Sequence, residues 1–348
     1  MKLVFVINDI ATERDYFTTP RIARRAIERG HDVSLVSLVD ITYEADETLS
    51  ALASVPRGDA YADDAALVAD LQADDATLSR IALDDADVVM LRMDPADEVL
   101  ERPWAHGSSL LFAQLLANRG VIVLNDPHRL TDASNKTYFQ QYPTAMRPRT
   151  AITRDADTIR RFVEAEGGKA VIKPLQGSGG QGVFVIRDGA GANLNQMIDA
   201  TLRDGYAIVQ EYLPAAADGD LRLLTLNGRP FVVDGTCACL RRYNESDDAR
   251  SNVSAGGSFE VVAPDEVALR VAAIAEPKLV QDGMYLAGLD IVGDRMMEVN
   301  VDTPGGITQV EELTGVDFCG AIVEDMERKV SLRAHYGGRF SNREIATA

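Results

Sequence analysis

The chain has 348 residues, of which 46% are hydrophobic and 26% charged, and these values are ordinary for a globular protein of two or three domains. Its formal net charge of −19 argues against a nucleic-acid partner, although a local group of cations can still bind a nucleotide. Three cysteines make no disulfide framework, and no run reaches the ~20 apolar residues that a membrane span needs, so a cytoplasmic protein without a membrane partner is expected.

The first 125 residues alternate between strand and helix patterns, which predicts a small α/β domain with a parallel sheet. Apolar runs at 3–7, 33–38, 87–91 and 121–124 predict its strands. One helix is predicted to begin at Thr18 or Thr19, with Pro20 in its first turn, and to end before Gly30; another covers 108–119. Residues 44–80, which are acidic and rich in alanine, predict peripheral helices or a mobile excursion. No GxGxxG motif follows the first strand, which disfavours a dehydrogenase.

Two further units are predicted after residue 125. Residues 126–205 combine helices at 134–141, 155–166 and 194–203 with strands at 170–174 and 183–187. Residues 206–348 contain strands at 207–213, 221–226 and 230–239, a polar loop at 242–257, and helices at 265–282 and 316–329. We therefore expect an α/β (α+β) fold with an N-terminal domain at 1–125, a central domain at 126–205, and a C-terminal domain with an antiparallel sheet at 206–348.

Residues 285–306 predict a β-hairpin in which three polar side chains interrupt two apolar strands, with Gly293-Asp294 marking the turn. If the loop has three residues, 293–295, Asp290 lies opposite Glu298, and Asn300 follows on the same face. A two-residue turn would place Asp290 on the other face. Two carboxylates and an amide are hard oxygen donors that suit Mg²⁺ shared with nucleotide phosphates; a solvated hairpin with scattered polar residues is the alternative.

A lysine followed by a glycine-rich loop predicts a phosphate site. Lys173 ends a strand, and the loop contains Gln176, Gly177, Ser178, Gly179 and Gly180. Glycines let backbone N–H groups approach a polyanion and form a concave nest, although a plain hairpin loop is the alternative. A second candidate cation, Lys136, is predicted to lie in a helix.

Three other segments contain candidate binding groups. The strand ending at Gln210, Glu211, Tyr212 and Leu213 suits a hinge that reads adenine, with Glu211 or Asp220 accepting from ribose hydroxyls. The arginines around the polar loop, with Asn252 behind them, predict either internal salt bridges or recognition of oxyanions; they are Arg222, Arg241, Arg242 and Arg250. Backbone N–H groups of Thr303–Gly306 can hold a substrate carboxylate.

The order of these motifs resembles that of the ATP-grasp ligases, and most closely the bacterial glutathione synthetases. The stretches GLDIVGDRMMEVNV and SNVSAGG carry most of the similarity, which runs from about Val88 to Lys329. The segment Leu91–Pro95 also resembles the substrate-side loop of that family.

The resemblance implies a site between the central and C-terminal units that joins a small-molecule acid to an amine through an acyl phosphate. ATP would contact Lys136, Lys173, the loop 176–180, Gln210–Leu213 and Asp220. Asp290, Glu298 and Asn300 would hold Mg²⁺, with Mn²⁺ as a substitute. Arg222 and Arg250 would stabilise developing charge, and Arg92, Asn252, Gly305 and Gly306 would contact substrate. A homo-oligomer is also implied.

Some positions depart from the family pattern. Met93 stands where a lysine is usual, and Thr308 and Gln309 stand where an arginine and an acidic residue are usual. The loss of two positive charges predicts either an acceptor or donor that is less anionic than γ-glutamylcysteine or glycine, or an altered binding mode. A natural-product ligase with another acid and amine, and an inactive nucleotide-binding module, are the alternatives to a glutathione synthetase.

Overall fold

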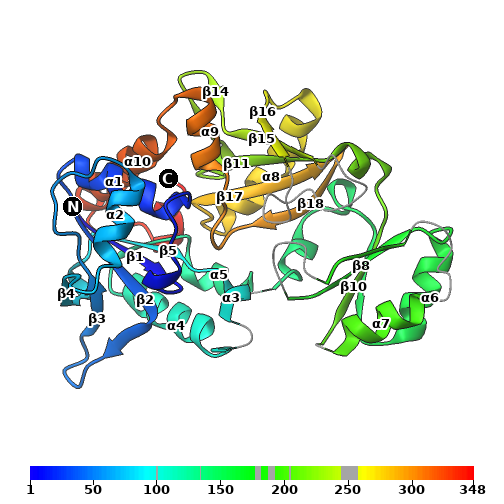
Figure 1. Ribbon diagram of the computed structural model, residues 1–348, viewed down its shortest axis with the longest axis horizontal. Helices are drawn as coiled ribbons and strands as arrows, with labels where there is room; N and C mark the ends of the chain where they lie inside the picture. Colours follow the sequence, from blue (N-terminus) through cyan, green and yellow to red (C-terminus); the bar gives the residue numbers. More distant parts are fainter. Residues whose placement is uncertain (99–100, 134, 177–181, 187–192, 204, 244–257) are drawn as a thin grey trace.

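The computed structural model describes residues 1–348 apart from 99–100, 134, 177–181, 187–192, 204 and 244–257. The chain builds three main sheets, and the sheet formed by β8 and β10 lies at the opposite side of the molecule from the N-terminal sheet (Figure 1). Both chain termini lie beside the N-terminal sheet (Figure 1). Within the described residues, no helix combines the length and the apolar character needed to cross a membrane.

The N-terminal sheet has six strands in the order β4-β3-β2-β1-β5-β6. Its strands are β1 (Lys2–Ile7), β2 (Asp32–Tyr43), β3 (Leu49–Ser54), β4 (Leu78–Ala82), β5 (Val88–Arg92) and β6 (Ile122–Leu124). Its helices are η1 (Ile10–Thr12), α1 (Thr18–Glu28), α2 (Asp64–Leu71), η2 (Leu83–Asp85), α3 (Pro95–Glu98), α4 (Ala105–Asn118) and α5 (Pro127–Asp132). The predicted parallel core is confirmed, because β2, β1, β5 and β6 all pair in parallel.

The interpretation of residues 44–80 as peripheral helices or a mobile excursion was right only for one short helix. They contain two strands, β3 and β4, which extend the sheet edge in antiparallel pairs, and the short helix α2. Leu49, Ala51 and Ala53 are buried on one face of β3, which is the alternation of a strand. Alanine has low strand propensity, so the abundance of alanine argued against a strand in this segment. Pairing with β2 stabilises the strand despite that propensity.

The central sheet is antiparallel and has the order β7-β10-β8-β9. Its elements are η3 (Tyr138–Gln141), η4 (Thr144–Met146), β7 (Thr150–Thr153), α6 (Ala156–Ala165), β8 (Ala170–Pro174), β9 (Phe184–Ile186), α7 (Leu194–Arg203), β10 (Ala207–Glu211) and η5 (Pro214–Asp218). β10 lies between β7 and β8, although it follows the boundary predicted at residue 205. Ile159, Ile172 and Val209 pack in a separate small core beneath this sheet.

The C-terminal sheet is antiparallel, as predicted, with the order β16-β15-β11-β17-β18. Its elements are β11 (Asp220–Leu226), β12 (Arg229–Pro230), β13 (Val232–Val233), β14 (Thr236–Cys237), β15 (Cys239–Tyr243), β16 (Ser258–Val261), α8 (Glu266–Gln281), β17 (Leu286–Val292), β18 (Arg295–Asn300), α9 (Ile307–Thr314), α10 (Phe318–Tyr336) and α11 (Asn342–Ala346). The single strand predicted at 230–239 was wrong. Asp234 and Gly235 both have positive φ, of 50° and 78°, and turn the chain between β13 and β14.

The last helices return the chain to the N-terminal sheet. α10 packs against α1, where Arg29 forms ion pairs with Glu324 and Glu327 (Figure 1). Asn342 of α11 exchanges two hydrogen bonds with the backbone of Val123 in β6. These contacts pack the C-terminal helices against α1 and β6.

Candidate active site

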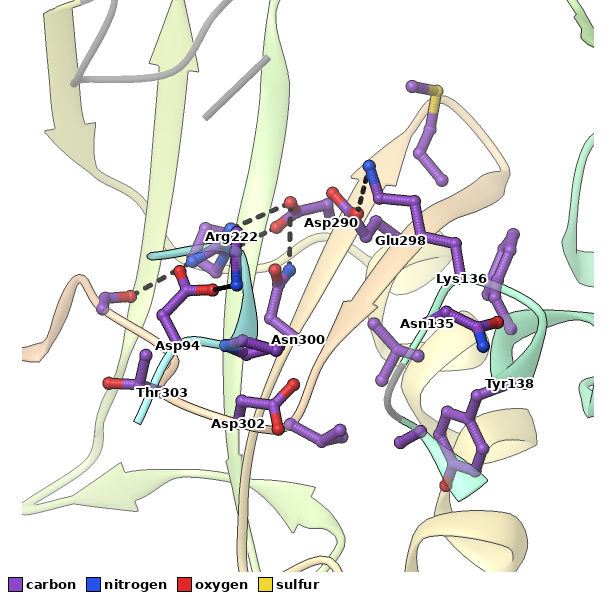
Figure 2. A pocket seen from close by; sticks show the side chains of 18 of the residues that line it. Asp94, Asn135, Lys136, Tyr138, Arg222, Asp290, Glu298, Asn300, Asp302 and Thr303 are labelled. Atoms are coloured by element: carbon purple, nitrogen blue, oxygen red, sulfur yellow. Dashed lines mark hydrogen bonds and ion pairs between the residues drawn. The ribbon is translucent and has the colours of Figure 1, made fainter. Parts of the chain in front are cut away.

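A cavity of about 1140 Å³ lies where the three sheets meet. Its lining comes from β8 and β10 of the central sheet, from β11, β17 and β18 of the C-terminal sheet, and from the segment after β5 of the N-terminal sheet. Figure 2 shows Asp290, Glu298 and Asn300 on the hairpin, with Lys136 on one side and Asp94 and Asp302 on the other. The site therefore draws its charged groups from segments far apart in the sequence.

The β17–β18 hairpin pairs Asp290 with Glu298, but not by the predicted three-residue loop. The loop is the two-residue turn Gly293-Asp294, with Gly293 at a φ of 57°, and Val292 pairs with Arg295. A bulge between Ile291 and Asp290 adds one residue to β18 and restores the pairing of Asp290 with Glu298. The predicted partners were right and the predicted loop was wrong.

Asp290 stands in a set of charges on adjacent strands of the C-terminal sheet. Its register partner Arg222 donates to both of its carboxylate oxygens, with Nη2 2.9 Å from Oδ2. Nη2 of Arg242 lies 3.0 Å from the same Oδ2, and Nδ2 of Asn300 lies 3.2 Å from it. Burial alone would raise the pKa of Asp290, but the two guanidinium groups hold it well below its ordinary value. Asp290 is therefore a carboxylate at neutral pH.

The backbone makes room for this charge set at one glycine. Gly288 pairs with Asn300 across the hairpin and lies on β17 two residues before Asp290. A Cβ at this position would lie 3.0 Å from Cδ of Arg222. Glycine at this position therefore lets Arg222 lie against the strand and reach Asp290.

Two lysines lie beside Glu298. Nζ of Lys136 is 3.5 Å from Oε1 of Glu298. Lys173 is 8% exposed, and burial lowers its pKa to about 8; Glu298 opposes this shift and Lys136 adds to it. The helix predicted for Lys136 was wrong, because Lys136 lies in a turn before η3, where its N–H donates to the carbonyl of Leu175 at 3.4 Å. That backbone bond places the turn beside the end of β8.

The predicted nucleotide-binding residues lie in different surroundings. Gln176 lines the cavity, and Gly177, Ser178, Gly179 and Gly180 lie outside the described residues. Gln210 is buried, lines the cavity and donates to Oγ1 of Thr150 at 3.1 Å. Asp220 lines the cavity and pairs with Arg242. Glu211 instead forms an ion pair with Arg149, and Tyr212 and Leu213 are outside the cavity lining.

The predicted substrate-binding residues are also divided. Gly305 and Gly306 line the cavity, and the Gly305 carbonyl accepts from Nη1 of Arg222 at 3.3 Å. Arg92 is buried outside the lining, where it donates to Oγ1 of Thr19 at 3.1 Å and to the Pro304 carbonyl at 3.3 Å. Burial lowers the pKa of Arg92 to about 10. Arg250 and Asn252 lie outside the described residues.

Asn125 is a positioning residue that the sequence analysis did not single out. Its side chain accepts from the N–H of Leu286 at 2.9 Å, donates to the Leu286 carbonyl at 3.0 Å, and donates to the Val301 carbonyl. It thereby ties the start of β17 to the chain that follows β18. Its place after a buried strand was the only sequence signal for this role.

Asp94, His106 and Asp302 also line the cavity; Asp94 lies in the segment that resembles the substrate-side loop, and His106 and Asp302 were not predicted as site residues. Nε2 of His106 lies 3.4 Å from Oδ1 of Asp302, within ion-pair distance but without the alignment of a hydrogen bond. Burial raises the pKa of Asp94 to about 6, although the Ala96 N–H, which donates to its carboxylate, opposes the shift. His106 and Asp302 are far apart in the sequence, so no local sequence pattern predicts their contact.

The hairpin donors fit a hard divalent cation. Asp290 and Glu298 supply carboxylate oxygens and Asn300 an amide oxygen, and all three line the same cavity. No cluster of three or more His, Cys, Asp or Glu side chains suited to a metal occurs in the described part of the chain, so the proposed donor set depends on the amide of Asn300 as well as the two carboxylates.

Two family models match nearly the whole chain. The prokaryotic glutathione synthetase N-terminal domain matches residues 1–131, and the ATP-grasp domain of the same family matches residues 135–315. A glutathione synthetase of Thermosynechococcus vestitus is 37% identical over 196 residues, which cover 56% of this chain and 59% of that protein. One of Synechocystis is 34% identical over 221 residues, covering 62% of this chain and 65% of that protein. The chain therefore aligns with less than two thirds of the length of these relatives.

Solved structures with this fold include a synthetase and a macrocyclase. The D-cycloserine synthetase DcsG superposes with a TM-score of 0.61 at 12% identity, covering 93% of this chain and 99% of that one. The macrocyclase MdnC superposes with a TM-score of 0.62 at 13% identity, covering 94% and 100%. At 12% and 13% sequence identity, these superpositions show a shared fold and nothing about substrates.

Proposed function

Because this chain belongs to the prokaryotic glutathione synthetase family, we propose that it is an ADP-forming, ATP-dependent carboxylate–amine ligase. The observation that carries the proposal is the convergence of two lysines with an Asp–Glu–Asn set in one cavity. Phosphoryl transfer needs positioned positive charge more than a covalent nucleophile, and the central and C-terminal units supply that charge to this cavity.

In this proposal Lys136 and Lys173 bind the ATP phosphates, and Gln210 lies on the adenine side. Asp290, Glu298 and Asn300 hold Mg²⁺, or Mn²⁺ in its place, which when bound neutralises phosphate charge. Lys136 is paired with Glu298. A polyphosphate that binds Lys136 would release Glu298, and a divalent cation that binds Glu298 would release Lys136. Nucleotide and metal should therefore bind cooperatively, since each releases the partner that the other needs.

The proposed reaction has two steps. A substrate carboxylate oxygen attacks the γ-phosphorus of ATP, and ADP leaves as an acyl phosphate forms. An amine nitrogen then attacks the acyl carbon, loses a proton and expels inorganic phosphate, which leaves an amide. We propose that Arg222, which donates to Asp290 and to the Gly305 carbonyl, and Arg250 stabilise negative charge in these steps.

The substrates are proposed at the level of class: a small acid, as in a γ-glutamyl dipeptide, and glycine or another amine. A natural-product ligase with a different acid and amine is the second candidate. The absence of positive charge at positions 93, 308 and 309 favours it, because Met93 is buried and Thr308 and Gln309 line the cavity.

The test is ADP release from ATP and Mg²⁺ with paired panels of acids and amines. Turnover should require both an acid and an amine, and Lys173→Met should raise the ATP concentration needed. Binding of ATP without turnover across the panels would favour a non-catalytic nucleotide-binding protein. ADP release that is independent of added acid and amine would overturn the ligase assignment.

A further inference from the structure

One end of the cavity is acidic and has a different character from the lysine end. We define this acidic end by Thr18, Asp94, His106 and Asp302, all of which line the cavity. Figure 2 shows Asp94 and Asp302 on the side of Asn300 that faces away from Lys136. Its residues come from the start of α1, the segment after β5, α4 and the chain beyond β18.

Three polar atoms at the acidic end have no hydrogen-bond partner among the described residues: Oγ1 of Thr18, Nε2 of His106 and Oδ1 of Asp302. Thr18 is 3% exposed and His106 is 6% exposed, so neither group is compensated by open solvent. Leaving a buried polar group unpaired costs stability, so such a group calls for a partner such as an ordered water, an ion or a ligand. The acidic end is therefore built to receive a polar ligand.

The charges at the acidic end indicate whether that ligand is positively or negatively charged. Arg222 and Arg242, the guanidinium groups on the cavity wall, are engaged by Asp290 and Asp220. Asp94 and Asp302 have no lysine or arginine partner among the described residues. A carboxylate placed here would meet two carboxylates, whereas an ammonium group would neutralise them.

We propose that Asp94 and Asp302 bind the positively charged amino group of the amine substrate, which belongs to the class of aliphatic amines without a neighbouring carboxylate. This inference rests on the proposed ligase function and specifies its second substrate. The acid substrate is assigned to the other side of Asn300, because its carboxylate must reach phosphate beside Lys136 and Lys173. His106 completes the subsite, since its ring nitrogen can hydrogen-bond to the amine or to Asp302.

The test is calorimetric titration of the full chain, saturated with ADP and Mg²⁺, at about pH 8, where a carboxyl with a pKa of about 6 is ionised. The probes are 1,4-diaminobutane and glycinamide, with glycine and glutarate as carboxylate-bearing comparisons. The amines should bind, and glycine should bind at least tenfold more weakly than its amide. Asp94→Asn and Asp302→Asn should each weaken amine binding by roughly tenfold to a hundredfold, the value of one charge-assisted contact.

Asp97→Asn is the matched control, because Asp97 is an exposed carboxylate of α3 outside the cavity lining. It removes the same charge nearby and should leave amine binding unchanged. Asparagine at 94 can still accept from the Ala96 N–H, so ADP affinity should also persist and report an intact fold. Equal binding of glycine and glycinamide, no binding of either amine, or unchanged binding in both asparagine variants would overturn the subsite.

Failure of the proposed function has a separate signature. If wild-type protein neither binds ADP nor releases it from ATP, the ligase assignment fails whatever the amines do. If ADP release occurs only with carboxylate-bearing amines such as glycine, the ligase stands and the acidic subsite is wrong.

Discussion

The two ends of the cavity handle buried polar groups in opposite ways. At the hairpin end, the two carboxylates of the hairpin have partners within the protein: Arg222 and Arg242 engage Asp290, and Lys136 engages Glu298. At the acidic end, Thr18 and His106 keep polar atoms without partners in the described chain. Polar groups that have partners contribute to the stability of the fold, and those without partners are available to a ligand. Substitutions at the hairpin end should therefore lower stability, whereas substitutions at the acidic end should mainly weaken ligand binding.

The largest expected effect is the loss of stability when the buried carboxylate of Asp290 is removed from the hairpin end. Asp290→Ala leaves two largely buried guanidinium groups without their shared carboxylate, which should cost about 3–5 kcal/mol of unfolding free energy and abolish turnover. Denaturant unfolding followed by circular dichroism measures the first effect and ADP release the second. Asp294→Ala in the exposed turn of the same hairpin is the control and should change stability by less than about 0.5 kcal/mol. Equal losses in the two variants would contradict the charge set.

Lys173 provides a pH test of the same end. Burial lowers its pKa to about 8 from 10.5, so between these values the unfolded chain binds a proton that the folded chain does not. Stability relative to Lys173→Met should therefore rise as pH increases from about 8 to about 10.5, by up to ~3 kcal/mol, and should be flat below pH 8. Urea unfolding of both proteins across this window measures the difference. A constant difference would mean that Lys173 is solvated.

The part of this end that sequence could predict is local. Alternation along residues 285–301 correctly identified Asp290, Glu298 and Asn300 as one polar set, since strand geometry fixes which side chains share a face. The bulge could not be predicted, because strand alternation does not show where an extra residue enters β18. The pairing of Arg222 and Arg242 with Asp290 depends on the register of three strands, and the contact of His106 with Asp302 depends on how two sheets dock.

Glu298→Gln removes the negative charge of this side chain and keeps its size and shape, so it tests metal binding separately from stability. The Glu298 side chain is 36% exposed and, among the residues that the structure describes, forms an ion pair only with Lys136, so the fold should persist. Mg²⁺-dependent ADP release should fall roughly a hundredfold, since even indirect partners of a metal contribute tenfold to a hundredfold. Turnover measured against Mg²⁺ concentration provides the test, with Glu312→Gln on the exposed face of α9 as the control. Near-native activity would remove Glu298 from the metal site.

The smallest expected effect lies at the acidic end and has the opposite sign. Thr18→Val keeps the shape of a residue that is 3% exposed but removes a hydroxyl that has no partner among the described residues. Because an unpaired buried hydroxyl is unfavourable, the variant should be more stable by up to about 1 kcal/mol, while its affinity for the ligand of the acidic end falls. Thermal unfolding and amine titration together give the result. A loss of stability would mean that the hydroxyl is already satisfied, and the contrast between the two ends would then rest on His106 and Asp302 alone.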